Sequence, residues 1–458
     1  MRKFLLLLPM IFLVFVAKAE YTIVNTVEQS FYTSYIVNYT SVGPDGETPA
    51  TVSGAITVPN SLASTILSIF FGVPMEPLTD IWVLDSHHTI ADNKNAPSVI
   101  GSSVAGSMII SALTVVIAPD YYGFGVTKDE VHPYLSQKQN ARNSLDLLKV
   151  AMEFLPEKQH IEPFMLCNLG YSQGAGVAMA AHYLLENDEA YTDIVPQFKG
   201  GLHTWCGDGP YDPVTTGKDI YSKPDHVIFP ALLPMLVNGF LTSAPADLTE
   251  GLSFKDFFTE AMLTPATIQN PVTGEPMDFP GIEKLIAAKE LNNDEVNAVM
   301  RAVAGGKSGL ADFFTAEMCD MESALYQKFN RWLVSNSVCT DWKPENEMFL
   351  YHLVEDDIVT FANTELAAEN LAIPADHYFA QHESEFKFKE GEEKHSQYAP
   401  QFFKSFGLQV LQVYRQATGI DAVHSATVAD APCYDMQGNK VGADYHGIVI
   451  SNSHKYIK

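Results

Sequence analysis

The stretch FMLCNLGYSQGAGVAMAAHYLL, residues 164–185, decides the fold of this chain. Its mostly apolar beginning, 164–169, predicts a buried strand, and residues 175–185 predict a helix rich in alanine and glycine. Between them stands Gly170-Tyr171-Ser172-Gln173-Gly174, which matches the pattern G-x-S-x-G. The two glycines let the strand and the helix approach around a tight turn that pushes the Ser172 hydroxyl out at the sheet's edge. Ser172 is therefore the candidate nucleophile.

On both sides of this segment, predicted strands alternate with predicted helices. A hairpin is expected where two β-rich runs, 35–41 and 51–58, flank Gly43-Pro44-Asp45-Gly46. Further strands are expected at 64–71, 114–118, 348–354 and 377–380, and helices at 136–154, 362–372 and 399–416. The alternation indicates an α/β fold with a mostly parallel sheet that helices cover on both faces.

The alternation stops between about residues 210 and 335, where only helical patterns with proline-rich connections occur. A helical insertion in an α/β core often forms a lid over the site, and otherwise it is plain scaffold. We therefore expect one catalytic domain over residues 20–429, with a helical lid inserted at about 210–335.

A serine nucleophile needs an imidazole base, and the imidazole needs a carboxylate that holds its tautomer. In this strand–turn–helix context the acid follows the serine along the chain, and the histidine comes last. The preferred acid is Asp356, which follows the predicted strand 348–354 and stands three residues before Val359. Asp357 and Glu355 are the alternatives.

The base has to follow the acid along the chain. His395 stands between a charged loop and the last predicted helix, which is where such a histidine belongs, so it is the preferred base. His382, which closely follows the predicted strand 377–380, is the alternative.

Two backbone N–H groups should stabilise the charge that develops on the substrate oxygen. The residue after the nucleophile, Gln173, supplies one. The second is expected from the loop that follows the predicted strand 64–71, at Val73. The loop at Asp120 competes for this role, although Asp120 could equally cap the turn that follows it.

Composition excludes several other classes of protein. The chain has 28 Lys and Arg against 55 Asp and Glu, and a net charge of -27 repels nucleic acid. Five cysteines without a CxxC pair are too few for a disulfide scaffold, although Cys319 and Cys339 could form one disulfide. No metal-ligand spacing and no phosphate-binding loop is present, so neither a metal nor a cofactor is expected.

The N-terminus predicts export. Arg2 and Lys3 precede an apolar run that is too short to span a bilayer, and Ala17-Lys18-Ala19 is a small-x-small cleavage site. Residues 1–19 are therefore expected to be a signal peptide that is cleaved after Ala19. The mature chain should be secreted, periplasmic or at the cell surface, with no stable membrane span.

Together these residues resemble the α/β-hydrolase superfamily and, more narrowly, the secretory lipase family. The matching features are the predicted hairpin, Pro119-Asp120-Tyr121-Tyr122-Gly123, the pattern at 170–174, and His352 with Asp356 and Val359. The resemblance implies hydrolysis of acyl esters through a Ser–Asp–His triad beneath a helical lid. The C-terminal residues 430–458 resemble the β-rich sorting tails of proteins exported by type IX secretion, or else form a hairpin packed on the domain.

The function expected from the sequence is that of a secreted carboxylesterase or lipase acting on small-molecule or lipid esters. The same triad would serve a peptidase or an esterase of plant-polymer acyl groups, and a non-catalytic surface binding protein is the third alternative. An apolar stripe in the lid would suit an acyl chain and transient lipid contact, or would equally pack inside the lid: Phe229, Leu232, Leu233, Met235, Leu236, Phe240 and Leu241.

Overall fold

The computed structural model describes residues 20–71, 75–103, 108–418, 433–435, 440–441, 448–451 and 454–457. Its centre is a nine-stranded sheet in the order β1-β2-β3-β5-β4-β6-β7-β10-β11. The strands are β1 (Tyr21–Glu28), β2 (Tyr32–Val42), β3 (Pro49–Pro59), β4 (Leu78–Ser86), β5 (Thr114–Pro119), β6 (Met165–Tyr171), β7 (Leu202–Gly207), β10 (Glu347–Leu353) and β11 (Tyr378–Gln381). The six strands from β5 to β11 run parallel, while β1, β2 and β3 are antiparallel to their neighbours.

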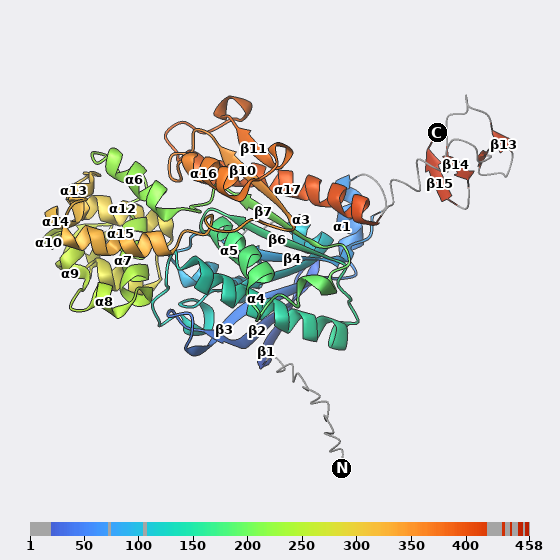
Figure 1. Cartoon of the computed structure of the whole chain (residues 1–458), viewed down its shortest axis with the longest axis horizontal. Helices are drawn as coiled ribbons and strands as arrows, with labels where there is room; N and C mark the ends of the chain where they lie inside the picture. Colours follow the sequence, from blue (N-terminus) through green and yellow to red (C-terminus); the bar gives the residue numbers. More distant parts are fainter. Residues whose placement is uncertain are drawn as a thin grey trace, which may run out of the picture.

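Helices cover both faces of this sheet (Figure 1). One face packs against α4 (Gln137–Phe154), α5 (Gln173–Asn187) and α16 (Ala362–Leu371). The other face packs against α17 (Lys394–Thr418), beside which lie α1 (Ala63–Phe71) and α3 (Met108–Leu113). The short connecting elements are α2 (Pro97–Ile100), η1 (Asn93–Asn95), η2 (Gly125–Thr127), η3 (Leu155–Gln159), η4 (Val195–Gln197), η5 (Ala375–His377) and η6 (Glu383–Glu385).

Between β7 and β10 the chain builds a separate helical cap, drawn in light green to orange in Figure 1. Its helices are α6 (Pro213–Ser222), α7 (Leu232–Ser243), α8 (Ala246–Thr249), α9 (Phe254–Phe257), α10 (Glu260–Leu263), α11 (Ile282–Ala288), α12 (Asn293–Val303), α13 (Leu310–Phe313), α14 (Ala316–Cys319) and α15 (Ala324–Ser335). The cap has an apolar core of its own, which buries Phe240, Phe257 and Trp332. It also contains a small hairpin, β8 (Ala266–Gln269) and β9 (Pro276–Phe279), that the helical pattern did not predict.

The first parallel strand was predicted in the wrong place. Residues 64–71 lie in helix α1, where Ala63 and Leu67 are buried one turn apart and Ile69 is 72% exposed. A short apolar run suits a buried helix as well as a buried strand, because periodicity cannot separate the two. The strand that the sheet uses is β4, whose last six residues, 81–86, are all buried.

The two cysteines considered for a disulfide are both free. Cys339 is buried in the core of the sheet domain, whereas Cys319 packs against the core of the cap. These separate surroundings, in two different apolar cores, are the physical reason that the pairing suggested by the sequence does not occur.

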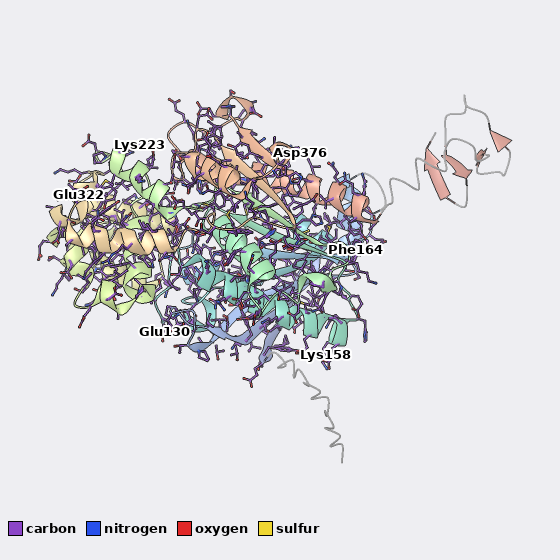
Figure 2. The ribbon with its side chains drawn as sticks, in the orientation of Figure 1. Glu130, Lys158, Phe164, Lys223, Glu322 and Asp376 are labelled. Carbon is purple, nitrogen blue, oxygen red and sulfur yellow. The ribbon has the colours of Figure 1, made fainter. Side chains whose placement is uncertain are left out.

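The surface carries the charge, as the exposed Glu130, Lys158, Lys223, Glu322 and Asp376 illustrate in Figure 2. None of the described helices is long and apolar enough to cross a membrane. At the C-terminus, β12 (Cys433–Asp435), β13 (Lys440–Val441), β14 (Ile448–Ser451) and β15 (His454–Ile457) form a second, antiparallel sheet of four strands. The predicted signal peptide, 1–19, lies outside the described residues.

Candidate active site

Ser172 occupies the turn between β6 and α5 in a conformation that L-residues rarely adopt, with φ 56° and ψ −126°. Such strain persists only where the surroundings impose it. Here they do: a Cβ on Gly170 would lie 2.0 Å from the Gly174 carbonyl oxygen, and a Cβ on Gly174 would lie 2.0 Å from that of Ser86. The two glycines of the motif therefore allow the close approach that forces the serine outward.

His395 lies in the first turn of α17, which packs on the face of the sheet opposite to α5. Its Nδ1 lies 2.6 Å from Oδ2 of Asp356, which follows β10. Its buried Nε2 has no hydrogen-bond partner within the protein. His395 and Ser172 line the same cleft. The imidazole therefore has one nitrogen held by a carboxylate, while the other makes no hydrogen bond within the protein.

Asp356 is held rigidly by its own turn. Its Oδ1 accepts the backbone N–H groups of Ile358 and Val359, both at 2.8 Å. Although burial would raise the pKa of this carboxyl, the charge and hydrogen bond of His395 lower it below its ordinary value. Burial alone would likewise lower the pKa of His395, but the charge of Asp356 raises it overall. Asp356 is therefore the ionised partner of the pair.

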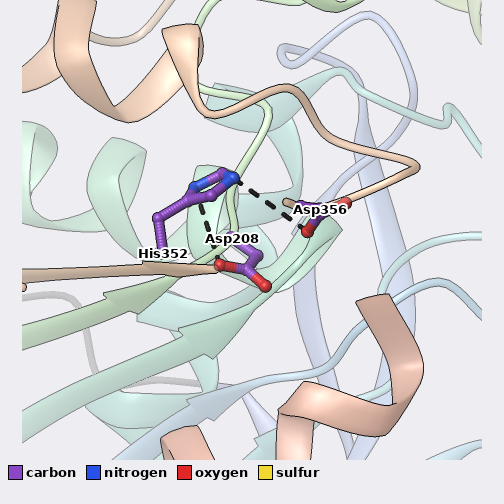
Figure 3. A group of neighbouring side chains, drawn as sticks. All are labelled: Asp208, His352 and Asp356. Carbon is purple, nitrogen blue, oxygen red and sulfur yellow. Dashed lines mark ion pairs between the residues drawn. The ribbon is translucent and has the colours of Figure 1, made fainter. Parts of the chain in front are cut away.

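A second carboxyl, that of Asp208 directly after β7, lies beside this pair, and Figure 3 shows it next to Asp356. It is fully buried, at a positive φ of 44°, and its Oδ2 lies 3.9 Å from His395 Nδ1. Burial, and then the charge of Asp356, raise the pKa of Asp208 well above its ordinary value. The opposite directions of the two shifts favour a neutral Asp208 beside an ionised Asp356.

The hydroxyl of Tyr171 ties Asp208 to the backbone of His395. It donates to the His395 carbonyl oxygen at 2.6 Å and to Oδ2 of Asp208 at 2.7 Å, so the two acceptors share its single hydrogen. These contacts hold the Asp208 carboxyl beside the start of α17.

Asp208, His352 and Asp356 together form a group that could ligate a metal (Figure 3). Each of them already has hydrogen-bond partners, however. His352 Nδ1 lies 2.6 Å from the Thr364 hydroxyl, and its Nε2 lies 3.0 Å from the Val359 carbonyl oxygen. Burial lowers the pKa of His352 to about 4, which keeps this imidazole neutral. These bonds account for the group as a network that braces the turn carrying Asp356.

The alternative candidates, His382 for the base and Glu355 and Asp357 for the acid, have other hydrogen-bond partners. His382 is exposed and pairs with Glu355 at 2.9 Å, which accounts for both residues at the surface. The Asp357 carboxylate accepts the backbone N–H of Lys394 at 3.0 Å and that of His395 at 3.3 Å. Asp357 therefore caps the start of α17 and does not contact the His395 ring through any described hydrogen bond.

Gln173 is fixed by its side chain, whose amide nitrogen lies 2.9 Å from His132 Nε2. The amide can only donate there, and His132 Nδ1 donates to the Tyr122 carbonyl at 2.8 Å. Burial lowers the pKa of His132 to about 3, so this ring stays neutral and keeps its role as acceptor. The backbone of Gln173 is thereby held at the turn that presents Ser172.

The second oxyanion donor cannot be placed at Val73 from the structure, because Val73 lies outside the described residues. The argument for it also fails, since the supposed strand before it is helix α1. Asp120, the competitor, is buried and accepts hydrogen bonds from Ser53 and Ser98, so its carboxylate is structural.

The loop that does abut the nucleophile follows β4, which is the neighbour of β6. Carbonyl oxygens of Ser86 and His87 crowd Gly174, and His88 lines the cleft with Ser172. Sequence reasoning missed this loop. The run IWVLDS at 81–86, followed directly by His87 and His88, was the signal that could have found it.

Comparison with solved structures agrees with this topology. The structure of LipA from Xanthomonas oryzae, a rice cell wall degrading esterase, matches with a TM-score of 0.54 at 17% identity, over 78% of this chain and 84% of that one. A protein from Legionella pneumophila described as a hydrolase matches with a TM-score of 0.58 at 18% identity, over 85% of this chain and 91% of that one. This chain has the α/β-hydrolase fold. Its sequence matches no protein-family profile and no curated protein.

Proposed function

We propose that this α/β-hydrolase-fold protein is a serine hydrolase of carboxylic esters, with Ser172 as nucleophile, His395 as base and Asp356 as acid. One observation carries the proposal. His395 Nδ1 lies 2.6 Å from a buried carboxylate, its buried Nε2 has no hydrogen-bond partner within the protein, and His395 lines the same cleft as Ser172. This is the division of roles that a general base for a serine requires.

In the proposed reaction, His395 Nε2 takes the proton of the Ser172 hydroxyl as its oxygen attacks the ester carbonyl. The tetrahedral intermediate collapses when His395 returns that proton to the departing alcohol, which leaves an acyl-serine. Water then attacks the acyl group by the same route and releases the acid and free Ser172. Asp356 stays ionised throughout and stabilises the imidazolium.

The negative oxygen of the intermediate would be held by two backbone N–H groups. One is that of Gln173, whose position His132 fixes. For the second we propose the N–H of His88, in the loop after β4, instead of that of Val73. Burial lowers the pKa of His88 to about 4, so its ring is neutral and adds no charge to the cleft.

A fluorophosphonate probe tests the proposal, because it reacts with activated serines. Ser172 should be labelled in the wild type, and Ser172→Ala should lose both the label and the hydrolysis of p-nitrophenyl butyrate. Ser396→Ala, which changes another serine in the same cleft, is the matched control and should keep both. Labelling that survives in Ser172→Ala would contradict the proposal.

A peptidase would use the same residues, as would an esterase of plant-polymer acyl groups. The apolar side chains that line much of the cleft, among them Ile110, Leu113 and Phe403, favour an acyl ester over a polar peptide.

We also propose that the chain is exported with cleavage after Ala19 and that residues 430–458 sort it to the surface. A chain ending at Ala429 should then keep its esterase activity and lose only surface attachment.

A further inference from the structure

The cleft that holds Ser172 has a volume of about 660 Å³, and it extends far beyond the catalytic residues. On α17 its lining residues run from His395 to Leu411. Sixteen residues of α-helix rise about 24 Å, which gives the length of the cleft along this helix. At the other end the cleft reaches Thr114, where β5 begins. Since β5 is parallel to β4 and β6, the cleft runs from the carboxyl edge of the sheet toward the opposite edge.

The two ends of the cleft differ in chemistry. The catalytic end is polar, with Ser172, His395 and Asn293 among its lining residues. The far end is lined mostly by apolar side chains from two helices: Ile110 and Leu113 of α3, and Phe403, Phe406, Val410 and Leu411 of α17. Lys404 of α17, whose residue is exposed, is the charged lining residue on this stretch of the helix. Apart from Lys404, this end suits a hydrocarbon.

A neighbouring hollow of about 310 Å³ opens on the polar side of the site. It shares Thr89, Phe229 and Asn293 with the cleft and adds carboxylates and amides, among them Asp92, Asn95, Asn292 and Asp294. An ester at Ser172 would thus have an apolar channel on one side and a polar hollow on the other. The acyl chain would bind in the channel and the alcohol in the hollow.

Gly407 lies in the apolar part of the cleft. It lies inside helix α17 between the lining residues Phe403 and Leu411, one turn from each. A Cβ built on Gly407 would meet no atom within 4 Å, so the space beside this glycine is open. Glycine in a helix interior weakens the helix and gives nothing to its core. Its gain here is room in the channel, about 18 Å along the helix from His395.

We propose that the cleft along α17 binds the acyl chain of a long-chain ester, of about twelve to sixteen carbons, and that the open space beside Gly407 admits chains of this length. The inference rests on the proposed ester hydrolysis and extends it to the substrate class. A carbon–carbon single bond is about 1.5 Å long, so even sixteen of them in a row reach no further than about 24 Å. Burial of each methylene can favour binding by up to about fourfold.

The test compares kcat/KM for p-nitrophenyl esters of 4, 8, 12 and 14 carbons, below their micellar concentrations. The wild type should improve at least threefold with each step up to 12 carbons. Gly407→Phe should keep its activity on the four-carbon ester within about twofold and fall at least tenfold on the 12- and 14-carbon esters. Replacement of a helical glycine does not disfavour the helix, so α17 should still form.

Two variants serve as controls. Gly407→Ala adds one methyl group and should shift the profile little. Gln412→Phe places the same large ring on an exposed position of α17 that does not line the cleft, and it should behave as the wild type. An unchanged chain-length profile in Gly407→Phe, or a wild type that prefers the four-carbon ester, would overturn the inference.

A binding measurement separates this inference from the proposed function. Titration calorimetry with sodium dodecanoate on Ser172→Ala protein should show binding, which Ser172→Ala with Gly407→Phe should lose. If dodecanoate binds in this Gly407-dependent way but no ester is cleaved by the wild type, the proposed function fails and the acyl channel stands. If esters are cleaved but dodecanoate binding ignores Gly407, the channel fails alone.

Discussion

At the carboxyl edge of the sheet, polar side chains are buried and tied to one another, whereas the cap is held together by apolar packing. The side chains of Asp208, His352 and Asp356 are all buried within one hydrogen-bonded network. In the cap, Phe240 and its aromatic neighbours Phe257, Phe329 and Trp332 contact one another edge-on or tilted. Buried polar networks fix geometry, while apolar cores mainly supply stability.

The two regions also contribute unequally to the cleft. Among the described residues the cap provides three lining residues, Phe229, Leu232 and Asn293, while α17 alone provides eleven. Most of the apolar stripe predicted for the lid is turned into the cap's own core, where Leu233, Met235 and Phe240 are buried. The acyl chain is therefore expected along α17, and changes in the two regions should have different consequences.

The largest effect should come from the base. His395→Ala should lower kcat for p-nitrophenyl butyrate by about 10⁶-fold, as removal of a base from a serine triad does. His382→Ala is the matched control and should stay within about twofold, because His382 is exposed and paired with Glu355. Comparable losses in both variants would break the assignment of the base.

The second largest loss of activity is expected when the acid is replaced. Asp356→Asn should lower kcat by about 10⁴-fold, since the amide no longer holds the correct tautomer of His395. Asp357→Asn removes the neighbouring carboxylate, which only caps α17, and should change kcat by less than about fivefold. Steady-state kinetics on both variants decides between them. A large loss in Asp357→Asn alone would reverse the assignment.

Replacing Asp208 tests which of the two neighbouring carboxyls, that of Asp208 or that of Asp356, acts as the acid. An asparagine can still donate a hydrogen bond as a protonated carboxyl does, so Asp208→Asn should keep kcat within about tenfold. If Asp208 were instead the ionised acid, this variant would lose as much activity as Asp356→Asn. Measuring both variants on one ester therefore tests which of the two carboxyls is the ionised one.

The pH profile reports the same network. His395 acts as base only when neutral, and the charge of Asp356 outweighs burial and raises its pKa. Activity should therefore be lost as the pH falls through a midpoint above the ordinary histidine value of about 6.5. The pH dependence of kcat/KM on a short ester measures this midpoint. A midpoint below 6 would show that burial prevails over the carboxylate.

The smallest effect on catalysis is expected from the core of the cap. Phe240→Ala removes a fully buried ring and should lower the free energy of unfolding by about 3–5 kcal/mol. Activity on p-nitrophenyl butyrate should stay within about threefold below the lowered melting temperature. Thermal unfolding and kinetics on the same sample provide the check. A loss of activity without a loss of stability would make the cap part of the catalytic machinery.

Much of the chain could be predicted from local patterns. The hairpin appears as β2 and β3, the predicted strand 164–169 as β6, and the last predicted helix as α17. These segments combine a clear period with turn residues. The run at 64–71 has no decisive period, so a helix there can resemble a strand, and the loop after β4, proposed above to supply an oxyanion donor, does not stand out in the sequence.

The sequence by itself determined the strand–turn–helix around Ser172, because glycine spacing and apolar periodicity act between residues close along the chain. It also narrowed the acid and the base to a few side chains. Only the tertiary structure brought Asp208 from β7 against Asp356 from β10, and only it opened the channel beside Gly407. Strand β7 pairs with β10 although the whole cap separates them in the sequence, and α17 packs beside α3. Both arrangements depend on contacts between residues far apart in the sequence, which no local pattern records.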